Sequence, residues 1–157
     1  MKKAISIGIQ GFSDLREQDC FFVDKTNFIK EWWGKRDVVT LIMRPRRFGK
    51  TLNMSMLDCF FSNKYANRAD LFEGLSIWQD ETYRKLQGTY PVIFLSFAAV
   101  KAGNLEDAKT QIKQEIARLY WENRNLMKED IFGEDERELY YRTTVKMDDV
   151  TAQDSLR

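Results

Sequence analysis

A short basic segment, Arg44 to Thr51, carries residue types that bind phosphate groups. It ends in Gly49-Lys50-Thr51, which matches the last three positions of the P-loop, or Walker A, pattern G-x-x-x-x-G-K-S/T. In a P-loop, backbone N–H groups at a helix N-terminus point at the phosphate, and the helix dipole adds to the attraction. Lys50 would contact the outer phosphates of a nucleotide, and the Thr51 hydroxyl would ligate Mg²⁺.

The flanking residues predict a strand before this loop and a helix after it. Residues 38–43 form an apolar, partly β-branched run, and a pattern typical of a packed helix covers about 49–61. Arg44 occupies the place of the first glycine of the P-loop pattern, so we expect a backbone path that differs from that of a standard P-loop. The alternative interpretation is a basic turn in which Lys50 and Thr51 only cap a helix.

A second strand and several helices follow the same scheme along the chain. Residues 90–97 are almost continuously apolar, as expected of a strand buried on both faces of a parallel sheet. This alternation predicts an α/β, P-loop NTPase-like fold in which helices cover a parallel sheet, with one such domain over 1–157. Apolar spacing and capping residues predict further helices over 28–33 with Gly34 as the stop, after Asn104, over 134–143 and from about Asp149.

The amino-acid composition excludes several classes of function. The chain has 157 residues and a net charge of +1, so any attraction to nucleic acid or membrane must come from a local patch. Histidine is absent, which excludes histidine-based catalysis and histidine-ligated metals. Cys20 and Cys59 lie in apolar surroundings and are expected to be reduced core thiols. Without a signal peptide or an apolar run long enough to span a membrane, we expect a soluble, cytoplasmic protein.

The chain offers few acids that could complete an ATPase. Hydrolysis needs an acidic residue at a strand end to hold Mg²⁺ and usually a carboxylate to orient water. Asp24 is the only acid that ends an apolar run, and we interpret it as the N-cap of the following helix, a position for which Thr26 is the alternative. The sequence therefore predicts a fragment whose sheet is incomplete and lacks the Walker B strand. With unpaired strand edges, we expect this chain alone to be marginally stable or to self-associate.

Four sequence blocks occur together in a fixed order and suggest a family. They are Phe22–Thr26, Arg44–Leu52, Ala69–Leu75 and Tyr90–Phe97. With these blocks the chain resembles the N-terminal part of the bacterial AAA-ATPase-like proteins, which often carry a PD-(D/E)XK nuclease-like domain at their C-terminus. The Arg-Pro-Arg-Arg-Phe opening is usual in that family, so Arg44 is a family variant of the P-loop.

The resemblance implies an ATP-binding domain that uses Mg²⁺. It also implies that the catalytic acids lie after residue 157, together with the nuclease-like domain that would be the route to any nucleic acid partner. The block from Val23 to Thr26 is expected to pack near the nucleotide. Nucleotide binding is assigned to Arg46, Arg47, Phe48, Gly49, Lys50, Thr51 and Leu52, with Thr51 as the Mg²⁺ ligand.

Two other functions stay open on the residues alone. The first is a basic nucleic-acid-binding module without NTPase activity, in which the loop cations contact phosphates and Phe48, Trp32 or Trp33 stacks on bases. The second is a small-molecule kinase, which shares the loop layout. A kinase also needs an acceptor-binding acid and lid arginines, and the sequence pattern identifies neither.

Overall fold

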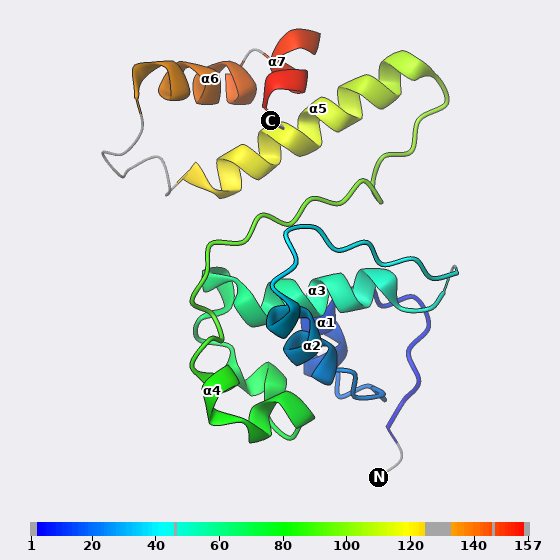
Figure 1. The fold of residues 1–157 in the computed structure, drawn as a ribbon. Coiled ribbons are helices and arrows are strands. Elements are labelled where there is room, and N and C mark those ends of the chain that lie inside the picture. Colours follow the sequence, from blue (N-terminus) through cyan, green and yellow to red (C-terminus); the bar gives the residue numbers. More distant parts are fainter. Residues whose placement is uncertain (1–2, 46, 125–132, 146, 156–157) are drawn as a thin grey trace. The chain divides into compact units, whose positions relative to one another are not determined.

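The computed structural model describes residues 3–45, 47–124, 133–145 and 147–155. The chain divides into two compact units, Met1–Val92 and Ile93–Arg157. All regular elements in the described residues are helices (Figure 1).

The described residues of the first unit form four α-helices and three short 3₁₀-helices. Helix α3 is the longest of them and follows the basic loop directly. The elements are α1 (Phe12–Glu17), α2 (Asn27–Lys35), α3 (Lys50–Phe61), η1 (Asn63–Tyr65), η2 (Ala69–Phe72), η3 (Ser76–Gln79) and α4 (Glu81–Arg84).

Aromatic rings dominate the core of this unit. Phe60 of α3 contacts Phe72 of η2 edge-on, with ring centroids 5.1 Å apart, and Phe72 stacks on Phe12 of α1 at the same distance. Phe61 carries the core to α2, where its ring stacks on Trp33 at 5.0 Å. Burying one such ring contributes on the order of 2–3 kcal/mol. The C-terminal half of α3 is therefore the part of the helix that anchors it.

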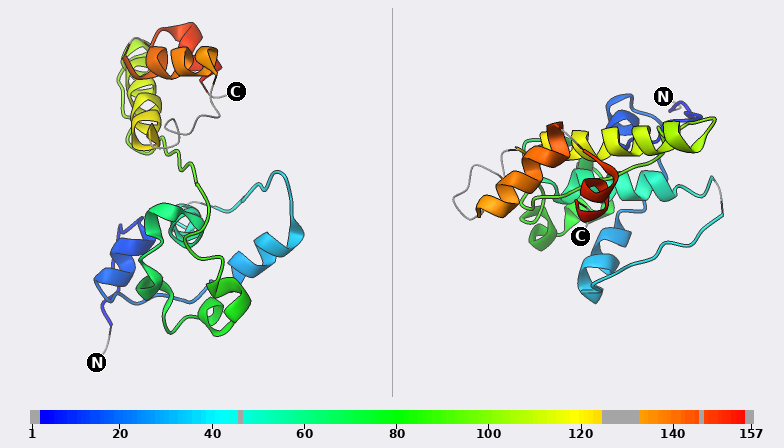
Figure 2. Two further views of the ribbon diagram at one scale, coloured as in Figure 1. Left: turned by 90° about the vertical axis from the view of Figure 1, so that its left-hand side faces the viewer. Right: turned by 90° about the horizontal axis from the view of Figure 1, so that it is seen from above.

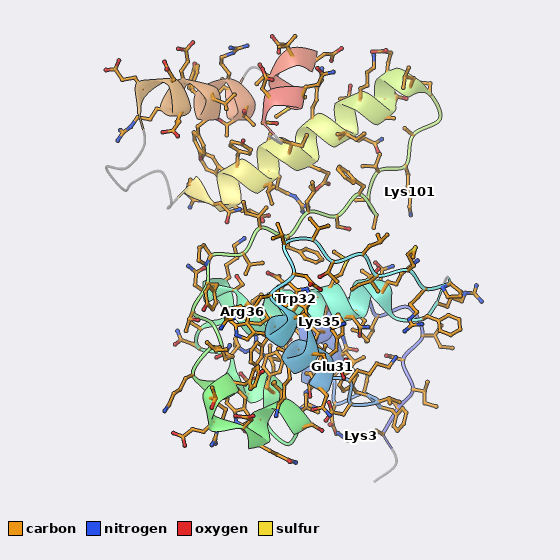
Figure 3. The ribbon with its side chains drawn as sticks, in the orientation of Figure 1. Lys3, Glu31, Trp32, Lys35, Arg36 and Lys101 are labelled. Carbon is orange, nitrogen blue, oxygen red and sulfur yellow. The ribbon has the colours of Figure 1, made fainter. Side chains whose placement is uncertain are left out.

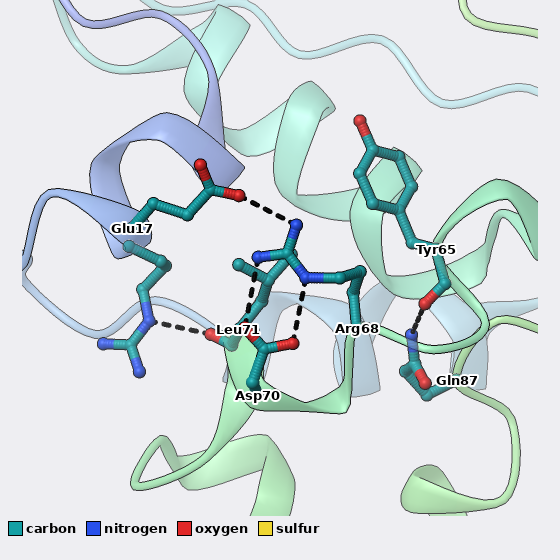
Figure 4. Close-up of polar contacts among 7 residues, drawn as sticks. Glu17, Tyr65, Arg68, Asp70, Leu71 and Gln87 are labelled. Carbon is teal, nitrogen blue, oxygen red and sulfur yellow. Dashed lines mark hydrogen bonds and ion pairs between the residues drawn. The ribbon is translucent and has the colours of Figure 1, made fainter.

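Two arginines fasten η2 to α1 through polar contacts (Figure 4). Arg68 lies between two carboxylates, donating to both oxygens of Asp70 and pairing with Glu17 of α1 at 2.8 Å. Arg16 of α1 donates from Nε to the Leu71 carbonyl at 2.8 Å. The hydrogen bonds from Arg68 lower the pKa of Asp70. These bonds fix the loop that brings Phe72 into the core.

The second unit contains α5 (Leu105–Glu122), α6 (Glu134–Val145) and α7 (Asp149–Asp154). Both α6 and α7 lie beside α5 (Figure 2). Tyr120 of α5 joins them, since its ring lies 5.9 Å from that of Tyr140 and its hydroxyl donates to the Ser155 carbonyl at 2.6 Å.

The predicted parallel sheet is wrong for the described residues, which contain no β-strand. Residues 38–43 and 92–97 are not assigned to strands, and among the described residues one parallel bridge, between Ser62 and Tyr90, is the closest approach to strand pairing. β-Propensity reflects how a side chain fits a pleated surface made by neighbouring strands. Neither apolar run has such a neighbour among the described residues, and Val38 is fully exposed. The core is built from helices instead.

The predicted helices agree more closely with the structure, because capping residues and apolar spacing act within one or two helical turns. Asn104 caps α5 by accepting from the Asp107 N–H at 2.8 Å, and α3, α6 and α7 begin close to the predicted positions. The predicted stop at Gly34 is wrong by two residues: α2 ends at Lys35, and Arg36 adopts the left-handed conformation with φ 53°. Both cysteines are free and buried, as predicted.

We predict that Gly88→Ala destabilises the first unit more than Gly74→Ala does. Both glycines have positive φ, so either alanine costs about 1–2 kcal/mol in backbone strain. At Gly88 the new Cβ would also lie 2.4 Å from the Ala66 Cα, whereas Gly74 faces open space. This overlap adds about 1–3 kcal/mol. Urea unfolding of the two variants measures the difference, and equal losses would contradict the close approach.

Candidate functional site

The N-terminus of α3 presents backbone N–H groups that lack helical acceptors. The first intrahelical bond of this turn runs from the Asn53 N–H to the Gly49 carbonyl at 2.9 Å. The N–H groups of Lys50, Thr51 and Leu52 precede it and have no acceptor within the helix. Gly49 is the N-cap, and no side chain caps the helix from this position. Among the described residues none of these three N–H groups donates to an acceptor outside the helix either, so these donors can face an anion.

The backbone before α3 alternates between the two hands. Arg47 has φ 68° and Gly49 has φ 74°, while Phe48 between them is not among the described residues with positive φ. Alternation of this kind turns successive N–H groups toward one side and forms an anion-binding nest. An arginine in the left-handed region is strained by about 1–2 kcal/mol, and such outliers tend to occur at functional sites.

Arg44 is not one of the left-handed residues. The described loop has positive φ at positions 47 and 49, and Arg44 is not among the described residues with positive φ. An arginine therefore fits where the P-loop pattern has its first glycine. Before Gly49, the described loop residue with positive φ is Arg47, a conformation that glycine would adopt without strain; the expected difference from a standard P-loop path stays a prediction.

The side chains of the predicted site face different surroundings. The Lys50 ammonium folds back over the loop and donates to the Arg44 carbonyl at 2.7 Å. Thr51 is exposed, Phe48 has 60% of its surface exposed, and Leu52 packs against the core cluster. Arg46 lies outside the described residues. The loop thus brings a lysine ammonium and a threonine hydroxyl to the same helix end as the free N–H groups.

Asp24, the only strand-end acid considered for Mg²⁺, is fully occupied by hydrogen bonds. One carboxylate oxygen accepts from the Thr26 N–H and hydroxyl at 2.9 and 2.6 Å, and the other accepts from the Ser76 N–H and hydroxyl, both at 2.7 Å. Thr26, the alternative N-cap, occupies the N-cap position of α2, although its side chain does not cap the helix. The predicted N-cap role of Asp24 is therefore replaced by a bridge between the start of α2 and the start of η3.

Partial burial acts to raise the pKa of Asp24, but the hydrogen bonds from Ser76 and Thr26 outweigh it and hold the pKa at about 2. The Thr26 hydroxyl also accepts from the Ile77 N–H at 3.1 Å. Sequence reasoning missed this bridge, because Ser76 lies 52 residues from Asp24 and no local pattern connects them. Asp24 has a structural role, and its acceptor positions are filled.

No other acidic metal site occurs in the described part of the chain. There, no group of three or more His, Cys, Asp or Glu residues is arranged to hold a metal ion. Among the same residues, no helix combines the length and the apolar character needed to cross a membrane.

Comparison with known proteins gives one family and one curated relative. The profile of a protein family described as "Predicted AAA-ATPase" matches residues 6–153. A protein from Azotobacter chroococcum mcd 1, described as "Uncharacterized protein in vnfD 5'region", is 31% identical over 114 residues. This match covers 72% of the present chain and 20% of the relative, so the chain spans about one fifth of that protein's length. No solved structure matches the chain.

We predict that acid weakens the first unit through Asp24. Because the folded-state pKa of Asp24 is lowered to about 2, its stabilisation is complete above the unfolded value near 4 and is lost as the pH falls through 2. Exposure of the carboxylate reduces the effect to about 1–2 kcal/mol. Asp24→Asn should lower the free energy of unfolding by this amount at pH 7. The loss of stability between pH 4 and pH 2 should be smaller in this variant than in the wild type.

Urea unfolding of both proteins between pH 2 and pH 7 measures the effect. Glu31→Gln on the exposed side of α2 serves as the matched control, since Glu31 takes no part in the bridge. An Asp24→Asn variant with the wild-type dependence of stability on pH would contradict the bridge.

Proposed function

Because the chain belongs to the protein family described as predicted AAA-ATPase, we propose that Arg47–Leu52 binds the phosphates of ATP together with Mg²⁺. Arg46 is included in this proposed loop on the sequence pattern alone. Family membership indicates ATP as the ligand, and the loop offers backbone N–H groups, an ammonium and a hydroxyl that suit its phosphates and Mg²⁺.

The alternation of φ at Arg47 and Gly49, directly before the first turn of α3, is the observation that carries this proposal. Free N–H groups at a helix start act as a partial positive charge of about 0.5 and bind phosphate without a side chain. The Lys50 ammonium adds a full charge that needs only to leave the Arg44 carbonyl. An anion with several phosphate groups could contact the nest and the ammonium together.

Mg²⁺ fits the same helix end. Magnesium in nucleotide sites keeps several water ligands and is usually held by the phosphates and one or two carboxylates; in P-loop proteins a loop Ser or Thr hydroxyl is a further ligand. The exposed hydroxyl of Thr51 is proposed as this loop ligand. When bound, the ion would neutralise charge on the outer phosphates.

These residues are proposed to bind the nucleotide, and none of them is proposed to hydrolyse it. Asp24 has its acceptor positions filled by Thr26 and Ser76, so it is a poor ligand for Mg²⁺. That hydrolysis requires acids beyond the given chain is a prediction from the family resemblance. The nuclease-like domain and any nucleic acid partner remain predictions from the family resemblance.

We predict that Lys50→Ala weakens MgATP binding by about 10- to 100-fold, because it removes a charged hydrogen-bond donor from the phosphates. Isothermal titration calorimetry on the full chain measures this change. Lys35→Ala, an exposed lysine in the last turn of α2, is the matched control and should bind like the wild type. Equal affinities of Lys50→Ala and wild type would overturn the proposal; salt-sensitive DNA binding that ATP neither competes with nor alters would favour the nucleic-acid-binding alternative.

We predict that Thr51→Val removes most of the gain in ATP affinity that Mg²⁺ provides, whereas Thr51→Ser keeps it. Valine has the shape of threonine but no oxygen for the metal, so the gain should fall at least about tenfold. Titrations of ATP with Mg²⁺ and with EDTA give the two affinities for each protein. A Thr51→Val variant with the full magnesium effect would exclude Thr51 as the metal ligand.

A further inference from the structure

The segment that leads into the phosphate loop is held by few contacts. In the described part of residues 37–45 no backbone N–H donates a hydrogen bond, and the one carbonyl that accepts a bond is that of Arg44. Four apolar side chains have between 76% and 100% of their surface exposed: Val38, Val39, Leu41 and Met43. Ile42 is the half-buried apolar residue of the run. Neither a sheet nor the core therefore fixes this segment.

One side-chain bond ties the middle of the segment to the folded unit. The Trp32 indole Nε1 donates to the Thr40 hydroxyl at 3.1 Å. Trp32 lies on α2 (Figure 3) and its ring packs against Phe61 of α3 with centroids 5.5 Å apart. The bond thus connects Thr40, four residues before Arg44, to α2, and α2 contacts α3 through the Trp32 and Phe61 rings.

The second hydrogen bond of the segment, from Lys50 to the Arg44 carbonyl, competes with the proposed phosphate ligand for the same ammonium. Lys50 donates to the Arg44 carbonyl, and an ammonium that turns to a phosphate oxygen must lengthen or break this bond. With nucleotide bound, the Trp32–Thr40 bond becomes the remaining hydrogen bond between residues 37–45 and the rest of the described chain.

We propose that Trp32 is a positioning residue for nucleotide binding, which acts through Thr40 to hold the segment before the phosphate loop. This inference rests on the proposed function and names a residue outside the loop that controls the same site. Ordering free backbone costs conformational entropy, and a loop that is already held loses less entropy when the ligand binds. Trp32 itself does not touch the nucleotide.

The test is a double-mutant cycle on the full chain with MgATP as the probe. Thr40→Val keeps the β-branched shape and removes the acceptor, and Trp32→Phe keeps a ring against Phe61 and removes the donor. Each change should weaken MgATP binding about three- to fivefold, the effect of one exposed hydrogen bond. The double variant should bind no more weakly than either single one, because both remove the same bond. Thr40→Ser retains the hydroxyl and should restore wild-type affinity.

Two further readouts separate positioning from general destabilisation. Thr40 is exposed, so Thr40→Val should leave the melting temperature unchanged. In the absence of nucleotide, trypsin should cleave Thr40→Val after Arg47 faster than it cleaves the wild type. Wild-type MgATP affinity in Thr40→Val, or losses that add in the double variant, would overturn the inference. If MgATP also binds Lys50→Ala as tightly as wild type, the proposed function itself fails. If only Lys50→Ala is impaired, the proposed function stands and the positioning role is wrong.

Discussion

Helix α3 must be buried at one end and open at the other, and the rest of the first unit follows from that constraint. Met56, Cys59, Phe60 and Phe61 are buried among the rings of α1, α2 and η2. The first turn, by contrast, begins at a glycine whose position provides no side-chain cap. Anchoring by the C-terminal half fixes the axis of the helix, so that the donors of the first turn have a fixed direction without any contact of their own.

The loop before α3 adds backbone conformation to this direction. Left-handed residues at Arg47 and Gly49 turn consecutive N–H groups together, and Lys50 lies over the same loop. Asp24 has a different task. It joins the starts of α2 and η3, and thereby stabilises the helix that carries Trp32. The proposed site therefore depends on backbone N–H groups and the Lys50 ammonium as donors, whereas Asp24 stabilises the fold of the first unit.

The parts of this structure that could be predicted are those with local causes. Cap residues such as Asn104 and the apolar spacing of α3 depend on neighbours within one or two turns. The sheet could not be judged this way, because a strand exists only when another segment pairs with it, and residues 38–43 have no such partner among those described. The Asp24–Ser76 bridge and the Trp32–Thr40 tether are likewise tertiary contacts that leave no local pattern. The family resemblance was confirmed at the level of the predicted AAA-ATPase family, since four ordered blocks carry more information than one loop.

Hydrogen–deuterium exchange of the full chain, with and without MgATP, tests the central claim most directly. If the N–H groups of residues 47–52 bind phosphate, their exchange should slow when MgATP is added, while exchange within α6 of the second unit should stay the same. Unchanged exchange at 47–52 at saturating MgATP, or protection elsewhere in its place, would contradict the account of the loop as a phosphate-binding nest.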